Sequence, residues 1–379
     1  MICRRNQTDT RSAQRGMTLI ELLTASLLAA FIMMGLVRLL DLTLDMWAKG
    51  EVRREGLERS NTVLGLLADD LRSLHGGGAG DLVIDWQPFD HDGDGLPDRT
   101  WPRLRFVRQV DAGALQRLRL RDLTEVEREA YGMGSTLAAA APPLPDATGL
   151  IEVAWAVLPA DRSDDPTGIL LRGERLLGDD TRDSLMGTNF FRSNGAPVAG
   201  SFLEVGGGIL WLGIECATQT SLVREGWHVG GALADACTSW DAYRRERPDL
   251  DLTPRNEPGA GMPAAGPRPI LPRRIRIVLE MERAKDQKRR TTLLNPVTAN
   301  TTRLEVDNGE RLPAPGGFVW VAGEWMEVVG VSADHMIVRR GARETRPREL
   351  PMGAMVHYGK RVVIEVPIPL HEDDWRVGN

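Results

Sequence analysis

An apolar run near the N-terminus constrains this chain more than any other feature. A basic, polar leader ends at Gly16, and the apolar run that follows it reaches Val37. A run of about twenty apolar residues is long enough to cross a bilayer as a helix. One carboxylate, that of Glu21, lies near the start of the run. Because an acid is costly in lipid, we expect Glu21 to have a function.

The charges before this run predict its orientation. The leader contains four arginines and a single aspartate: Arg4, Arg5, Arg11, Arg15 and Asp9. The positive-inside rule places such a leader in the cytoplasm, so everything after about Val37 lies outside the membrane. The sequence therefore predicts a single-pass membrane protein with its N-terminus in the cytoplasm and most of its mass on the other side of the membrane.

The residues at the start of the run form a recognisable signal. Arg15-Gly16 is followed by Met17-Thr18-Leu19-Ile20-Glu21-Leu22-Leu23. This order resembles the class III signal of type IV prepilins and type II secretion pseudopilins, although family members usually have Phe where this chain has Met17. The resemblance implies that a prepilin peptidase cleaves between Gly16 and Met17 and that Met17 is N-methylated. The alternative is an uncleaved signal anchor in which Glu21 occurs by chance.

The resemblance also implies a role for Glu21, the fifth residue of the mature chain. In the family this glutamate pairs with the N-terminal amine of a neighbouring subunit as the filament assembles. A buried carboxylate is tolerated when a cation neutralises it, so the implied role is physically reasonable.

A helical pattern continues beyond the membrane segment. Apolar residues recur at spacings of three and four as far as Leu74, and Gly76-Gly77-Gly78 then breaks the helix. We predict a helix over residues 17–75, membrane-spanning over about 17–37, whose second half lies on a sheet. A long helix laid on antiparallel sheets is an α+β fold of the pilin-like kind. The alternative, an anchor followed by a coiled coil, is weaker because the heptads are poor.

The remaining segments predict strands separated by loops. Segments 159–167, 173–205 and 243–269 are rich in Gly, Pro, Asp or Arg and indicate loops. Short apolar or alternating runs predict strands: Leu82–Trp86, Leu104–Val107, Leu115–Leu120, Leu150–Leu158, Ile169–Leu171, Ile209–Ile214, Ile275–Met281 and Val362–Pro367. We assign a leader at 1–16, the long helix at 17–75, and a periplasmic α+β domain at 80–288 and 361–379.

Residues 289–360 have a different pattern, which predicts a small all-β insertion. Short apolar runs alternate there with tight turns, including Gly323-Glu324-Trp325-Met326 and Arg340-Gly341. The segment is similar to small β modules of phage tail and surface proteins. Strands 275–281 and 362–367 flank it and are expected to pair, so the insertion would lie at the tip of a hairpin, where insertions are tolerated. Its role is either contact with cargo or a partner, or decoration.

Two further segments resemble the J family of minor pseudopilins of type II secretion. Residues 152–157 with Leu170-Leu171-Arg172 resemble its paired strands, and residues 271–279, which begin Leu-Pro, resemble its late strand. The resemblance implies a structural subunit at the tip of the periplasmic pseudopilus. It implies four kinds of partner: the prepilin peptidase, other major and minor pseudopilins, an inner-membrane assembly platform and the lipid bilayer. The minor pilin W family of type IV pili shares this layout and is the near alternative.

An Asp-rich loop predicts a Ca²⁺ site. The loop Asp90-His91-Asp92-Gly93-Asp94-Gly95-Leu96-Pro97-Asp98 places carboxylates at positions one, three, five and nine, and Gly95 at position six. Leu96 would contribute its carbonyl oxygen. This spacing of hard oxygen ligands suits Ca²⁺ and resembles the loops of dockerins and thrombospondin type 3 repeats. Position twelve is Trp101 where the EF-hand loop has Glu. The alternative to a Ca²⁺ site is a solvated acidic turn between strands. The alternative to a filament subunit is a membrane-anchored Ca²⁺-dependent binding protein that never enters a filament.

Three cysteines are present, and Cys3 falls within the leader. Cys216 and Cys237 remain in a periplasmic domain, where a disulfide between them is one hypothesis and two buried thiols are the other.

Charge and motif content exclude two function classes. The formal net charge is −6, and removing residues 1–16 leaves about −9, which argues against nucleic acid as a partner. The six histidines have no zinc-ligand spacing, and no nucleophile elbow or phosphate-binding loop occurs. We therefore predict that the protein is not an enzyme.

Overall fold

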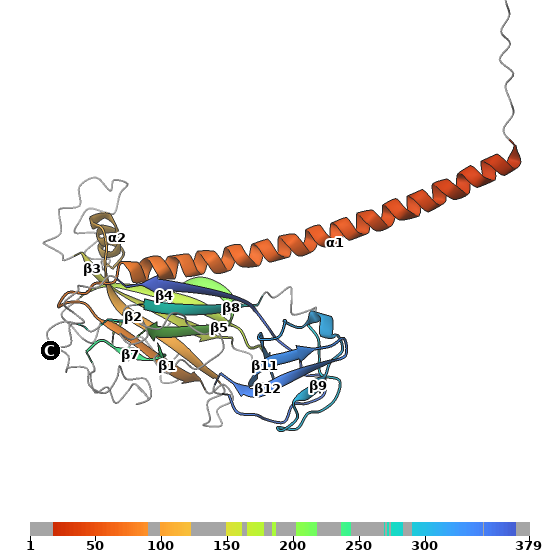
Figure 1. Cartoon of the computed structure of the whole chain (residues 1–379). Coiled ribbons are helices and arrows are strands. Elements are labelled where there is room, and N and C mark those ends of the chain that lie inside the picture. The colour runs from red at the N-terminus through yellow and green to blue at the C-terminus, as the bar shows by residue number, and fades with distance from the viewer. Residues whose placement is uncertain are drawn as a thin grey trace, which may run out of the picture. The chain divides into compact units, whose positions relative to one another are not determined.

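The computed structural model consists of an N-terminal helix and two antiparallel sheets (Figure 1). It describes residues 18–89, 99–122, 149–160, 165–177, 184–186, 202–217, 236–243, 269, 271–272, 274–282, 290–343 and 345–368. A long apolar helix with large antiparallel sheets is the α+β class that the sequence predicts.

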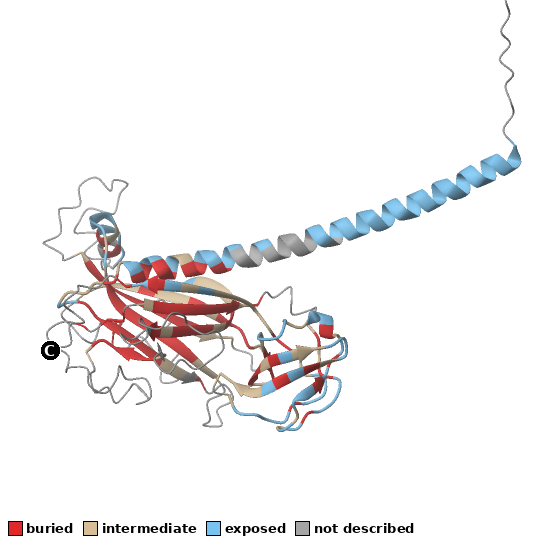
Figure 2. Cartoon of the chain, viewed as in Figure 1, coloured by how far each residue is buried: buried red, intermediate tan, exposed pale blue. Residues whose placement is uncertain are grey.

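Helix α1 (Leu19–Arg72) is 54 residues long. The chain divides between Glu55 and Gly56 into two compact units, so α1 belongs partly to each. In the first unit, the apolar side chains from Leu19 to Trp47 are exposed (Figure 2). In the second unit, the helix buries Val63, Leu64, Leu67 and Leu71 and ends four residues before Gly76.

The main sheet has nine strands in the order β13-β8-β5-β4-β3-β2-β1-β7, with β6 paired to β5. Every pairing is antiparallel. Its strands are β1 (Leu82–Phe89), β2 (Arg99–Gln109), β3 (Leu150–Pro159), β4 (Gly168–Leu176), β5 (Leu203–Ala217), β6 (Ala236–Cys237), β7 (Trp240–Asp241), β8 (Arg274–Met281) and β13 (Lys360–Pro367).

The core lies between one face of this sheet and the second part of α1. The helix residues recur at three- and four-residue spacing, which gives the helix one apolar stripe. Large side chains from the sheet meet that stripe, and each adds roughly 1.5–3 kcal/mol of hydrophobic stabilisation on burial. They include Phe106, Val153, Trp155, Leu170, Leu212 and Ile277.

One predicted strand is a helix in the structure. Residues 115–120 belong to α2 (Ala112–Asp122). Leu115 and Leu118 are both buried, and their three-residue separation places them on the same side of a helix. The carboxylate of Asp111 accepts a hydrogen bond from the backbone N–H of Ala114 at 2.7 Å, which caps the first turn. The alternation of Leu118 with arginines suggested a strand, but the spacing and the cap favour a helix.

A second sheet of four strands lies in sequence between β8 and β13. Its order is β10-β11-β12-β9, and it has a core of its own, which includes Val319, Met326, Val328 and Met336. Its elements are β9 (Arg303–Glu305), the short 3-10 helix η4 (Gly309–Arg311), β10 (Phe318–Val321), β11 (Glu324–Val331) and β12 (His335–Ala342). Strands β8 and β13 pair over their whole length, from Arg274 opposite Pro367 to Met281 opposite Lys360. This is the expected hairpin, and we call residues 290–359 the β module.

Candidate functional site

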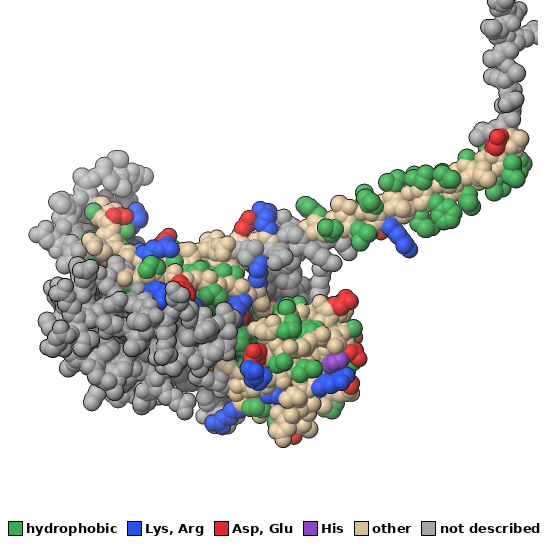
Figure 3. All heavy atoms as spheres, in the orientation of Figure 1, with side chains coloured by type: hydrophobic (Ala, Val, Ile, Leu, Met, Phe, Trp, Pro, Cys, Tyr) green, Lys and Arg blue, Asp and Glu red, His purple; other side chains and the backbone are tan. Residues whose placement is uncertain are grey.

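The first part of α1 has the composition of a membrane segment. Residues Leu19–Leu44 form a helix long and apolar enough to cross a membrane. Hydrophobic side chains cover this part of the helix in Figure 3. Its hydroxyl groups bond to the helix's own backbone: Thr24 Oγ1 donates to the carbonyl of Ile20 at 3.0 Å, and Thr43 Oγ1 to that of Leu39 at 2.6 Å. Hydroxyls satisfied in this way are compatible with an apolar surrounding.

Glu21 caps the first turn of this helix. Its Oε2 atom accepts hydrogen bonds from the backbone N–H of Thr18 at 2.9 Å and from Thr18 Oγ1 at 3.0 Å. The N–H of Glu21 donates to Thr18 Oγ1 at 3.4 Å. This reciprocal pair is a capping box, which satisfies donors that a helix N-terminus leaves unpaired. The carboxylate therefore points back toward the residues before the helix. The predicted cleavage site, Gly16 and Met17, lies outside the described residues.

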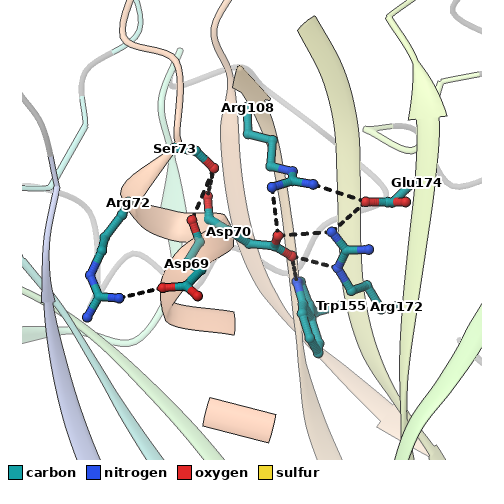
Figure 4. A network of polar contacts seen from close by, with 8 residues as sticks. All are labelled: Asp69, Asp70, Arg72, Ser73, Arg108, Trp155, Arg172 and Glu174. Atoms are coloured by element: carbon teal, nitrogen blue, oxygen red, sulfur yellow. Dashed lines mark hydrogen bonds and ion pairs between the residues drawn. The ribbon is translucent and has the colours of Figure 1, made fainter. Parts of the chain in front are cut away.

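The end of α1 is fixed to the sheet by a partly buried ionic cluster, which we call the clamp: Asp70, Arg108, Trp155, Arg172 and Glu174 (Figure 4). Asp70 is only 1% exposed. Its carboxylate accepts hydrogen bonds from Arg172 Nε at 2.6 Å and Trp155 Nε1 at 3.0 Å, and it forms an ion pair with Arg108 at 3.1 Å. Glu174 contacts both guanidinium groups, at 2.5 Å from Arg172 and 3.1 Å from Arg108.

The clamp joins α1 to three neighbouring strands. Arg108 comes from β2, Trp155 from β3, and Arg172 and Glu174 from β4. Two carboxylates face two guanidiniums, so the cluster is neutral and its members are hydrogen-bonded, as burial of charges requires. The two arginines lower the pKa of the Glu174 carboxyl, which makes this carboxylate a weak base. We therefore interpret the clamp as a positioning device for the helix and not as a catalytic centre.

A glycine lets the helix approach the sheet closely beside the clamp. A Cβ atom at Gly206 of β5 would lie 3.1 Å from the Val63 side chain of α1. That separation is tighter than ordinary van der Waals contact, so a larger residue would displace the helix. Gly206 therefore makes room for α1 on the sheet.

The clamp gives the protein a predictable dependence on pH. Burial would raise the pKa of the Glu174 carboxyl, but Arg172 and Arg108 outweigh burial and lower it below its ordinary value of 4.5. A lowered acid pKa contributes stability that is present above the unfolded pKa and lost as the pH falls through the folded pKa. We expect the melting temperature of the Glu174→Gln variant to depend less on pH below about 4.5 than that of the wild type. Equal pH dependence in the two proteins would contradict the prediction.

The opposite face of the sheet contains a second set of buried charges. Asp85 on β1 bonds to Arg103 and, at 3.1 Å, to Arg105, both on β2. Glu152 on β3 accepts hydrogen bonds from Ser184 Oγ and the Leu185 N–H, both at 2.6 Å. Burial raises the pKa of Glu152 in spite of these bonds, so its contribution to stability decreases as the pH rises above 4.5.

The predicted Ca²⁺ loop lies outside the described residues, so the arrangement of Asp90, Asp92, Asp94, Leu96 and Asp98 stays a prediction. Residues 90–98 connect β1 to β2, which pair up to Phe89 opposite Arg99. The loop is therefore the connection of an antiparallel hairpin. Within the described residues, no group of three or more potential metal ligands occurs.

The two predicted disulfide partners lie on adjacent strands. Cys216 of β5 is directly opposite Cys237 of β6 in the antiparallel register. The side chain of Cys216 is buried in the main core. Directly opposite residues in an antiparallel pair have Cβ atoms about 4.5–5.5 Å apart, close to the separation that a disulfide needs.

Comparison with known proteins adds no family to these observations. No model of a known protein family matches the chain, and a search of curated proteins finds no significant match.

The sequence singles out Glu21, whose role stays a prediction, but it contains no motif that identifies the clamp. The clamp's signal in the sequence is Asp70, an acid between Leu67 and Leu71 on the apolar stripe of the helix. A buried acid implies a buried partner. The partner itself is not readable from the sequence, because Arg172 lies 102 residues further on.

Proposed function

We propose that this chain is a minor pseudopilin of a type II secretion system, most similar to the J family, and a structural subunit of the pseudopilus tip. The observation that carries the proposal is the position of Glu21. It is the fifth residue after the predicted cleavage site, and its carboxylate faces the helix N-terminus within an exposed apolar segment. Cleavage would give Met17 a positively charged amine, and the Glu21 carboxylate of a neighbouring subunit is negatively charged. Either charge alone is costly in lipid, so pairing the two is favourable there.

The division of α1 into an exposed apolar part and a buried part supports the same proposal. An apolar helix with no polar stripe needs either lipid or other apolar helices around it. Lipid supplies that surrounding before assembly, and the helices of neighbouring subunits supply it in a filament. The clamp keeps the periplasmic domain in one position on the second part of the helix.

The experiment that tests this function is mass analysis of the native protein's N-terminus. We expect the mature chain to begin at Met17 and to carry one methyl group on its amine. The Gly16→Asp variant should keep residues 1–16. A wild-type chain that retains residues 1–16 would instead indicate a membrane-anchored binding protein.

The same mass measurement, made before and after reduction and alkylation, tests the cysteine pair. We propose that Cys216 and Cys237 form a disulfide, with the two electrons and two protons passing to the thiol-oxidising system of the periplasm. Alkylation of two additional thiols after reduction is the expected result. Alkylation of both thiols without reduction would show that the pair is not oxidised.

We also propose that residues 90–98 bind Ca²⁺ as a structural ion. Carbonyl and carboxylate oxygens at this spacing suit a site of extracellular affinity, with a Kd of about 0.1–1 mM or tighter. Isothermal titration calorimetry of the full chain should detect this binding, and the Asp92→Ala variant should lose it. The absence of a binding signal at millimolar Ca²⁺ would remove the proposal.

The near alternative is a W-like minor pilin of a type IV pilus. Both assignments predict the same N-terminus and the same role for Glu21. Identification of the subunits that co-purify with the mature protein separates them, because one assignment predicts pseudopilins and the other predicts pilins.

A further inference from the structure

The β module meets the main sheet at a joint built around one arginine. We call these residues the joint: Trp211 of β5, Glu280 of β8, Phe318 of β10, Trp325 of β11 and Arg343, which follows β12. Two of them come from the main sheet and three from the module. Their positions therefore determine how the module is held on the sheet.

Arg343 makes both a paired and a stacked contact across the joint. Its guanidinium donates to Glu280 through two nitrogens, at 2.5 and 3.1 Å, and both side chains are buried. Three rings surround the same guanidinium, with centroids 4.5 Å away for Trp211, 4.2 Å for Phe318 and 4.1 Å for Trp325. Desolvated bidentate pairs and cation–π contacts are among the stronger polar interactions in proteins.

The backbone at Arg343 is strained. Its φ angle is +53°, in the left-handed region that non-glycine residues rarely adopt. Such a conformation is unfavourable for a residue with a Cβ atom and persists only where the surroundings impose it. The contacts of the side chain with Glu280 and the three rings are what offset this cost.

The interior of the module does not depend on the joint. Its apolar core is separate from the core under α1. It also has an ion pair of its own, in which the fully buried Glu324 accepts from Arg340 Nε at 2.7 Å and from the Gly341 N–H at 3.0 Å. Loss of the joint would therefore leave the interior contacts of the module intact.

A second set of contacts lies where the chain enters and leaves the module. Glu282, which follows β8, bonds to Arg290 Nε at 2.5 Å and to His357 Nδ1 at 2.9 Å. The Arg290 guanidinium lies 3.9 Å from the ring centroid of Tyr358, two residues before β13. These contacts join the segment that enters the module, at Glu282 and Arg290, to the segment that leaves it, at His357 and Tyr358. The module would therefore rotate about this point.

We propose that Arg343 is a latch that holds the β module in one orientation on the main sheet. When the Arg343 side chain leaves the joint, the module moves as an intact body about the connections at Glu282 and Tyr358. Leu210 of β5 also packs against Trp320 and Trp325 at this joint, so the latch adds a directional polar contact to a small apolar one.

The experiment is hydroxyl-radical footprinting of the full chain in nanodiscs, read by mass spectrometry. The sharpest variant is Arg343→Gly, because glycine accepts the φ angle of +53° and removes only the side chain. We expect oxidation of Trp211, Phe318 and Trp325 to increase by about tenfold or more. Met326 and Met336 in the module core, and Trp155 in the main core, should stay protected.

Two further variants decide the interpretation. Glu280→Gln removes the charge that pairs with Arg343, and the substituted residue belongs to the main sheet and not to the module. This variant should expose the same three rings. Arg339→Ala breaks an exposed ion pair with Glu327 in the same module and should change nothing. Selective exposure of the joint rings in either latch variant supports the proposal. Unchanged rings in both, or oxidation of Met326 and Met336 together with the rings in both, overturns it.

Discussion

The Asp70→Ala variant is expected to lose about 3–5 kcal/mol of the free energy of unfolding, because it removes the buried carboxylate of the clamp and leaves two largely buried guanidiniums with Glu174 as their one remaining clamp carboxylate. Asp70 bonds to Arg172 and Trp155 and forms an ion pair with Arg108, at distances of 2.6 to 3.1 Å. A loss of this size is a large fraction of the 5–15 kcal/mol by which most domains are stable. Denaturant unfolding of the solubilised full chain, followed by near-UV circular dichroism, measures it.

The adjacent residue provides a matched control for this prediction. Asp69 lies on the same turn of α1 and pairs with Arg72 at 2.6 Å, but both side chains are exposed. Exposed ion pairs contribute about 0–1 kcal/mol to the free energy of unfolding, so Asp69→Ala should change that free energy little. Similar losses in the two variants would mean that burial of the clamp is not what makes Asp70 important.

The Glu21→Ala variant is expected to be cleaved normally and to enter the filament at least about tenfold less than the wild type, a change that corresponds to about 1.4 kcal/mol or more. The substitution removes both the carboxylate charge and the helix cap that Glu21 makes with Thr18. Quantitative immunoblotting of purified filaments and membranes measures incorporation, and N-terminal mass analysis measures cleavage.

Two variants separate the charge of Glu21 from its capping role. Glu21→Gln keeps an oxygen acceptor for Thr18 and removes the charge, so it should fail in assembly as Glu21→Ala does. Thr18→Ala removes the hydroxyl bond and keeps the charge, so it should assemble. Normal incorporation of Glu21→Ala would refute the proposed pairing with a neighbour's amine.

The outline of the fold was predictable because local patterns determine it. The apolar run, the three- and four-residue spacing and Gly76–Gly78 predict α1 and its end, which the structure places at Arg72. Strands 275–281 and 362–367 are paired as expected, in β8 and β13.

Short segments were less predictable from the sequence. Residues 115–120 form part of a helix, and residues 173–205, read as a loop, include the end of β4 and the start of β5. Such segments contain too few residues for their periodicity to be decisive.

The sequence by itself determined the membrane-compatible helix, the position of Glu21 five residues after Gly16, and the antiparallel character of the sheets, because each depends on spacing along a local stretch. Only the tertiary structure decided which charges meet. Asp70 with Arg172, and Glu280 with Arg343, are separated by 102 and 63 residues. Their pairing depends on how the sheet orders its strands and where α1 and the β module lie on it. A buried charge requires a partner, but only the packing of the chain determines which residue that partner is.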